Sequence, residues 1–318
     1  MQFAMPPPSR KSSNPPAYAS AFSSPRLPTF VPRRRRLQFI AILACGTFAI
    51  LVLFSRIFSS SSRRPPSGTA EVVLVTTIDD QGFSKEYIEK IKKNRLDYAE
   101  RHGYATFFPA RTDYNIKGAP TGWAGIPAMR HALTAFPNSK FFFFLGQGAL
   151  IMNPSLSLNS HITSRERLEN LMLRDTSVVP PDSVIKTFAH QNGDEVDLIL
   201  TQHEDGLGQR SFILRQGDWA KFFLDTWFDP LFRSYNFQKA EAHALEHIVQ
   251  WHPTILTKLA LVPQRIMSAF NTVPGEYGDQ GKFQEGDFVI RFPKCDYGRP
   301  SECETLMKPF FPQDTEGQ

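Results

Sequence analysis

Residues Phe141–Leu145 most constrain the fold, because four consecutive phenylalanines and a leucine leave no polar face on this segment. A strand of this composition is buried on both sides, as in sheets that helices cover on both faces. In open α/β folds, the carboxyl ends of such strands border the ligand site. Here the strand is followed by Gly146, Gln147 and Gly148. The sequence therefore predicts an α/β fold with two glycines at positions where polar residues of a ligand site are expected.

The segments around this strand alternate between strand-like and helix-like patterns. The first part of the chain predicts strands at 71–79 and 104–110, a helix within 84–104 that has Ser84 as N-cap and ends before Gly103, and a second helix at 126–136. Further strands are expected at 197–201, 211–215 and 286–292, and further helices at 217–228 and 240–252. This alternation predicts a central, mostly parallel sheet.

The positive net charge of the chain is concentrated at its amino terminus. Ten of the 36 Lys and Arg residues, and none of the 31 Asp and Glu residues, lie before residue 65, so the remainder carries 26 basic and 31 acidic side chains. Because the body is mildly acidic, the net positive charge gives no support to nucleic-acid binding by this part of the chain. We therefore expect no nucleic-acid partner.

Residues 37–54 form an apolar run, extending to 58, that is long enough to cross a bilayer, for which about 20 residues suffice. Four arginines, Arg33 to Arg36, precede it and favour a cytosolic amino terminus. The sequence thus predicts a single-pass type II membrane protein. Its expected parts are a basic tail (1–36), a transmembrane anchor (37–58), a linker (59–70), a luminal domain (71–311) and a short tail (312–318).

Two cysteines of the expected luminal domain, Cys295 and Cys303, lie eight positions apart in a loop-like stretch. In an oxidising compartment they are expected to pair. Spacing alone also allows two free thiols, so the pairing is one of two interpretations.

Several segments, taken in order, resemble the fungal Golgi members of glycosyltransferase family 34. They include "NRLDYAERHGY", "GWAGIPAMRHALTAFPNSKFFFFL", "ALIMNPSLSL", "ALEH" and "GDFVIRFPKC" within residues 71–311. This galactosyl/mannosyltransferase family includes the α-1,6-mannosyltransferase subunits of the mannan polymerase complex. The resemblance implies a GT-A nucleotide-sugar-binding fold, a Golgi membrane location, GDP-mannose as donor, an N-glycan acceptor and assembly with catalytic mannosyltransferase subunits.

The metal-ligand positions of active relatives are altered in this chain. Those relatives hold Mn²⁺ with Asp-x-Asp and a later histidine, and the matching residues here are Gly146, Gly148 and Arg291. The resemblance therefore implies that this chain carries no metal of its own. Further positions of the family pattern are also replaced. Gly125, Gly208, Ala242 and His243 stand where the family has polar residues, and Arg210 stands where it has glycine.

Three functional hypotheses follow. The chain is a subunit of the mannosyltransferase complex without metal-dependent catalysis of its own, or it is a metal-independent hexosyltransferase with Arg291 and Lys294 on the donor pyrophosphate. A third and remote hypothesis is a zinc hydrolase, because His243 and His247 match the spacing of two zinc ligands on one helix face.

Donor-binding residues are expected near the end of the first strand. Asp79 ends that strand, where GT-A enzymes contact the nucleotide, although an acid there also suits the start of a helix. Asn94, Arg95 and Tyr98 of the following family-like helix are further candidates.

The predicted topology can be tested in sealed Golgi vesicles. Because four arginines precede the apolar run, a tag at the carboxyl terminus should resist added protease until detergent opens the vesicles. Cleavage of the tag in intact vesicles would contradict the predicted orientation.

Overall fold

The computed structural model describes residues 69–180, 183–203, 206–235, 237–272, 279–297 and 299–312. The predicted anchor, 37–58, lies outside these residues, as do the basic tail and most of the linker. Within the described ranges, none of the helices is both long enough and apolar enough to cross a membrane.

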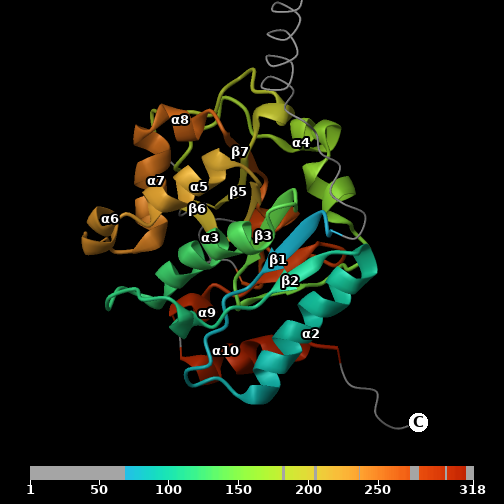
Figure 1. The fold of residues 1–318 in the computed structure, drawn as a ribbon. Helices are drawn as coiled ribbons and strands as arrows, with labels where there is room; N and C mark the ends of the chain where they lie inside the picture. The colour runs from blue at the N-terminus through green and yellow to red at the C-terminus, as the bar shows by residue number, and fades with distance from the viewer. Residues whose placement is uncertain are drawn as a thin grey trace, which may run out of the picture. The chain divides into compact units, whose positions relative to one another are not determined.

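Figure 1 shows the order of the elements along the chain. The strands are β1 (Val72–Val75), β2 (Ala105–Phe107), β3 (Phe141–Leu145), β4 (Ala149–Ile151), β5 (Leu198–His203), β6 (Gly206–Arg215), β7 (Leu259–Val262), β8 (Ala269–Phe270) and β9 (Val289–Arg291). The α-helices are α2 (Lys85–His102), α3 (Gly125–Ala135), α4 (Arg165–Leu171), α5 (Asp218–Trp227), α6 (Pro230–Ser234), α7 (Glu241–Trp251), α8 (Pro253–Leu256), α9 (Lys294–Tyr297) and α10 (Pro300–Met307).

The central sheet is mixed. Within the described residues it has six strands in the order β2-β1-β3-β6-β5-β7. The pairs β1–β2, β1–β3 and β5–β7 are parallel, whereas β6 runs antiparallel to both β3 and β5. Only two residues separate β5 from β6 in the sequence, which is too few for the crossover that a parallel pair needs. The α/β class is therefore confirmed, while the expected mostly parallel sheet contains an antiparallel centre.

Local sequence signals account for the first helix. The side chain of Ser84 accepts a hydrogen bond from the Tyr87 backbone N–H, and Gly103 ends α2 with a φ of 67°. This left-handed conformation suits glycine because it has no Cβ. The polar stretch 202–210, which the sequence pattern predicts to be a turn between strands at 197–201 and 211–215, contains strand instead, because β5 extends to His203 and β6 begins at Gly206.

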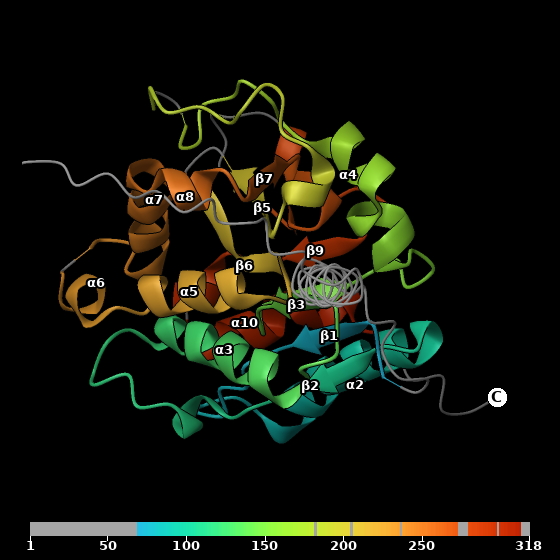
Figure 2. The same ribbon diagram turned by 45° about the horizontal axis from the view of Figure 1, so that its top comes forward.

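Strand β3 supplies both halves of the core, as its composition predicts. Phe142 and Phe144 pack in the cluster that contains α3, α5 and α7, whereas Phe141, Phe143 and Leu145 pack on the opposite face with α2 and α4. Figure 2 shows α3, α5 and α7 on one side of the sheet and α4 on the other. A strand buried on both faces needs this two-sided cover.

A small sheet and the last helices close the carboxyl end of the central sheet. Strand β9 pairs with both β4 and β8, which places β9 beside the segment that follows β3. Helix α10 packs against α2 through Cys303 and Met307 (Figure 1). A disulfide joins Cys295 of α9 to Cys303 of α10. The segment after β3 is thereby enclosed by parts of the chain that are distant in sequence.

Replacement of Phe143 by alanine should lower the free energy of unfolding by about 3–5 kcal/mol, because its ring is fully buried and its removal leaves a cavity. Urea unfolding of the purified protein measures this loss. Phe222→Ala is the matched control, since the Phe222 ring is about half exposed, and it should cost much less. Equal losses for the two variants would contradict the two-sided burial of β3.

Candidate functional site

A cleft of about 90 Å³ lies where β1 and β3 end. Its wall is built from segments far apart in the sequence: Thr77, Asp79, Phe83, Tyr87, Arg111, Thr121, Gly122, Gly125, Phe144, Gly146, Gln147, Gly148, Arg210, Cys295, Asp296 and Cys303. The position agrees with the rule that ligands of α/β folds bind outside the carboxyl ends of the strands. We therefore treat this cleft as the candidate functional site.

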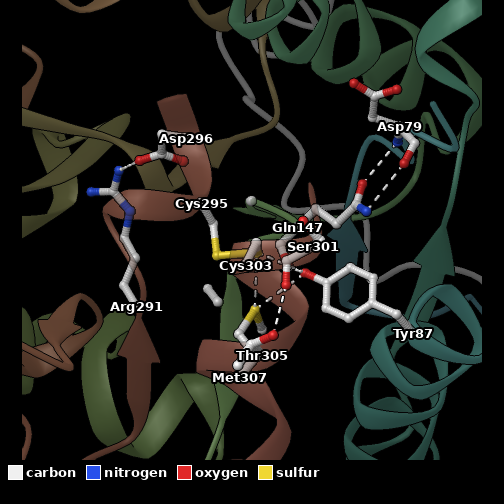
Figure 3. Close-up of a disulfide and its surroundings, with 12 residues drawn as sticks. Asp79, Tyr87, Gln147, Arg291, Cys295, Asp296, Ser301, Cys303, Thr305 and Met307 are labelled. Carbon is white, nitrogen blue, oxygen red and sulfur yellow. Dashed lines mark hydrogen bonds and ion pairs between the residues drawn. A yellow bond between two sulfur atoms is a disulfide. The ribbon is translucent and has the colours of Figure 1, made fainter. Parts of the chain in front are cut away.

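Asp79 lies on the cleft wall, and its carboxylate is already paired. Arg111 Nε lies 3.0 Å from Asp79 Oδ1. The Asp79 backbone N–H donates to Gln147 Oε1 at 2.8 Å, and Gln147 Nε2 donates to the Asp79 carbonyl at 3.2 Å (Figure 3). β1 ends at Val75, so Asp79 follows the strand instead of ending it, and Gln147 fastens this segment after β1 to the segment after β3. Gln147, the residue between the two glycines, thus uses its side chain to bind the backbone of Asp79.

The other predicted donor-binding residues support this segment from behind the cleft. Asn94 forms two hydrogen bonds with the backbone of Ile151, its amide nitrogen donating to the carbonyl and its oxygen accepting from the N–H. The Tyr98 hydroxyl donates to the Leu156 carbonyl at 2.9 Å. Neither side chain lines the cleft. Because the polar atoms of both side chains bind backbone groups, Asn94 and Tyr98 hold the segment after β3 in place.

Arg95 has the same supporting role. Its guanidinium is fully buried and donates to the carbonyls of Gly146 at 3.0 Å and Ala149 at 2.7 Å. Burial lowers the pKa of Arg95 to about 10, which still leaves it protonated at neutral pH. The cation therefore holds both ends of the Gly146–Ala149 turn through its carbonyl oxygens.

The two glycines at the altered ligand positions have different surroundings. A Cβ at Gly148 would lie 2.6 Å from the Cβ of Cys295, which the disulfide holds in place. A Cβ at Gly146 would lie 3.3 Å from the Arg210 carbonyl oxygen. Real Cβ atoms essentially never approach another heavy atom as closely as 2.6 Å. Position 148 thus has no space for the aspartate of the family pattern.

Neighbouring side chains also fill the space at further glycines that replace polar residues of the family pattern. A Cβ at Gly125 would lie 2.7 Å from the Phe144 ring, and one at Gly208 would meet the Thr201 hydroxyl. Neither position has free space for the polar side chain that the resemblance implies.

Arg291 and Lys294, the predicted cations for a pyrophosphate, are not on the cleft wall. Arg291 is buried, forms an ion pair with Asp296 and lies over the Phe270 ring (Figure 3). Lys294 is exposed. The cations on the wall are Arg111 and Arg210, which sequence reasoning did not nominate. For Arg210, the sequence signal was its place at a position where the family pattern has glycine.

Arg210 occupies the inner end of the cleft between two carboxylates. Its Nη2 lies 2.7 Å from Glu241 Oε1, and its Nε lies 3.5 Å from Asp296 Oδ1. Tyr87 closes the other side, where its hydroxyl donates to the Gln147 carbonyl at 3.2 Å. Burial raises the pKa of Tyr87, which keeps that hydroxyl protonated and able to donate.

The two histidines with zinc-ligand spacing make other contacts. His243 Nδ1 accepts a hydrogen bond from the Lys239 backbone N–H, and His247 packs beside the rings of Phe232 and Trp251. Within the part of the chain that the structure describes, no group of three or more His, Cys, Asp and Glu side chains is placed to hold a metal ion.

The crowding at position 148 has a measurable consequence. Gly148→Ala should lower the free energy of unfolding by about 1–3 kcal/mol, because the new methyl group is forced against Cys295. The matched variant Gly146→Ala should cost less, since its nearest neighbour is farther away. Denaturant unfolding of both variants checks the order, and a greater loss for Gly146→Ala would contradict the described packing.

Comparison with known proteins supports the family resemblance. The model of the galactosyl transferase GMA12/MNN10 family matches residues 68–302. An uncharacterised α-1,2-galactosyltransferase of Schizosaccharomyces pombe is 28% identical over 262 residues, covering 80% of this chain and 78% of that protein. A second such protein from the same species is 30% identical over 256 residues, covering 71% of this chain and 67% of its own length.

A Saccharomyces cerevisiae protein named probable α-1,6-mannosyltransferase MNN11 is 30% identical over 253 residues, covering 73% of this chain and 60% of that protein. Among solved structures, a glycosyltransferase involved in glycosylation of the major capsid of PBCV-1 covers 74% of this chain and 98% of its own, with a TM-score of 0.49 and 11% identity. That structural likeness is too weak to carry an argument. The family match spans most of the described residues, and on that ground the chain belongs to the GMA12/MNN10 family, glycosyltransferase family 34.

Proposed function

We propose that this chain is a type II Golgi membrane subunit of an α-1,6-mannosyltransferase complex that elongates the outer chain of N-glycans. It contributes a glycosyltransferase fold and partner surfaces, without metal-dependent transfer of its own. In this proposal the catalytic partners bind GDP-mannose and Mn²⁺. The relative MNN11, named a probable α-1,6-mannosyltransferase, supports the choice of reaction.

One observation carries the proposal, and it is the closed space at position 148. A divalent ion in a donor site needs oxygen ligands with room to reach it. The Cys295 Cβ lies 2.6 Å from where a Cβ at Gly148 would lie. The disulfide-linked segment therefore occupies the space that a side chain at position 148 would need. The filled positions at Gly125 and Gly208 support the same conclusion.

A metal-independent hexosyltransferase is the second candidate. It is favoured by the presence of Arg111 and Arg210 on the cleft wall, because guanidinium groups can stabilise a leaving diphosphate. In this version the two arginines act in place of Arg291 and Lys294. Their pairing with Asp79, Glu241 and Asp296 weighs against it.

Arg111→Gln distinguishes the two candidates in cells that lack the endogenous chain. Loss of the chain should shorten N-glycan outer chains, measured by mass spectrometry of released glycans. If the chain is a non-catalytic subunit, Arg111→Gln should restore outer-chain length to within about twofold of the wild type, because it removes only a partly exposed ion pair.

The matched control is Arg130→Gln, which removes the surface pair with Asp225. If the chain is a metal-independent enzyme, Arg111→Gln should reduce transfer by about 10²-fold, the size expected for loss of a preorganised charge, while Arg130→Gln has no effect. Unchanged outer chains after removal of the whole subunit would contradict the proposed function.

A further inference from the structure

Four charged side chains, two of them buried and two of them partly exposed at the cleft, form an alternating row in the order Arg291, Asp296, Arg210 and Glu241. Their side chains are 5%, 9%, 16% and 4% exposed. Arg291 pairs with Asp296, Asp296 with Arg210, and Arg210 with Glu241. Buried charges lose the hydration that stabilises them in water, so each needs a partner within the protein. The row is balanced because it contains two cations and two anions.

The middle pair of this row belongs to the cleft itself. Arg210 and Asp296 line it, whereas Arg291 and Glu241 do not. The charged groups on the cleft wall are Arg111, Arg210, Asp79 and Asp296, whose formal charges sum to zero. A diphosphate ligand would therefore meet no net positive charge, and it would approach the Asp296 carboxylate. Like charges at short range oppose such binding.

Asp296 is held in this position by the chain on both sides. It follows Cys295 directly in the short helix α9, and the Cys295–Cys303 disulfide ties that helix to α10. Figure 3 shows the Asp296 carboxylate directed at Arg291, away from the disulfide. The contact with Arg210 is the longer of its two ion pairs, at 3.5 Å. Arg291 and the disulfide thus fix the carboxylate, and Arg210 is the cleft cation that it neutralises.

We propose that Asp296 is an internal counter-ion that occupies the place of an anionic ligand beside Arg210 and thereby excludes phosphorylated ligands from the cleft. This inference rests on the proposed function, since it explains how the charges beside the cleft of a glycosyltransferase fold are balanced by the chain itself. With Asp296 neutral, the cleft wall would carry one net positive charge and would accept a diphosphate without a metal ion.

The test uses Asp296→Asn in the full chain, titrated calorimetrically with inorganic pyrophosphate in the presence of a chelator. The wild type should bind pyrophosphate at least tenfold more weakly than the variant. Adding Arg210→Gln to the variant should abolish the gain, because Arg210 is the cleft cation that Asp296 pairs with. Parallel titrations with GDP and UDP distinguish binding of the diphosphate from a contribution of the nucleoside.

Asp287→Asn is the matched control. Asp287 is similarly buried and pairs with an arginine, Arg265, but it does not line the cleft. It should gain no affinity for pyrophosphate. A gain equal to that of Asp296→Asn would overturn the inference, because it would show that loss of any buried carboxylate is sufficient.

Asp296→Asn leaves the buried Arg291 without its carboxylate partner, so the double variant Asp296→Asn/Arg291→Gln is measured beside it. The double variant keeps the same charge change on the cleft wall and should show the same gain. Circular dichroism and thermal unfolding establish which variants are folded.

If the folded variants bind pyrophosphate no better than the wild type, the inference about Asp296 is wrong, while the proposed subunit function stands. Manganese-dependent mannosyl transfer by the unmodified chain alone would instead overturn the proposed function and leave the binding comparison unchanged.

Discussion

The buried ion pairs around Asp296 are the constraint on which the site depends. Arg210 and Arg291 place two positive charges near the end of β3, and the chain supplies Asp296 and Glu241 to balance them. Removing one member would leave a buried charge without its partner, which is strongly destabilising. The segment that carries Asp296 must therefore stay beside β3. The Cys295–Cys303 disulfide fixes that same segment, so charge balance and covalent linkage favour one arrangement.

The same arrangement explains why the segment after β3 keeps an ordered form without acidic side chains. Arg95 donates to the carbonyls of Gly146 and Ala149, and Gln147 binds the backbone of Asp79. These contacts are internal to the protein and need no ion. Cys295 occupies the space beside Gly148, which makes glycine the residue that fits there. The fold and the closed cleft therefore depend on one set of contacts.

The sequence predicted the elements whose pattern is local and strong. The all-apolar β3 and the capped helix α2 were found where expected, because burial on both faces and the Ser84 and Gly103 signals depend on nearby residues. Family membership was also predictable from ordered segments. The direction of β6 and the convergence of Arg210 with Asp296 were not predicted, since they depend on pairings between residues far apart in the chain. Asn94 and Arg95 showed the reverse, as their place in a family-like helix suggested donor binding while their contacts are with backbone carbonyls and amides.

The central claim is that the cleft at the end of β3 does not hold a divalent ion together with a nucleotide. Electron paramagnetic resonance of Mn²⁺ measures this directly, because the signal of the free ion falls when the protein binds it. Titration of Mn²⁺ into the purified chain with GDP, and separately with UDP, should leave the free-ion signal the same as in nucleotide alone. Stoichiometric loss of that signal, dependent on both protein and nucleotide, would contradict the account.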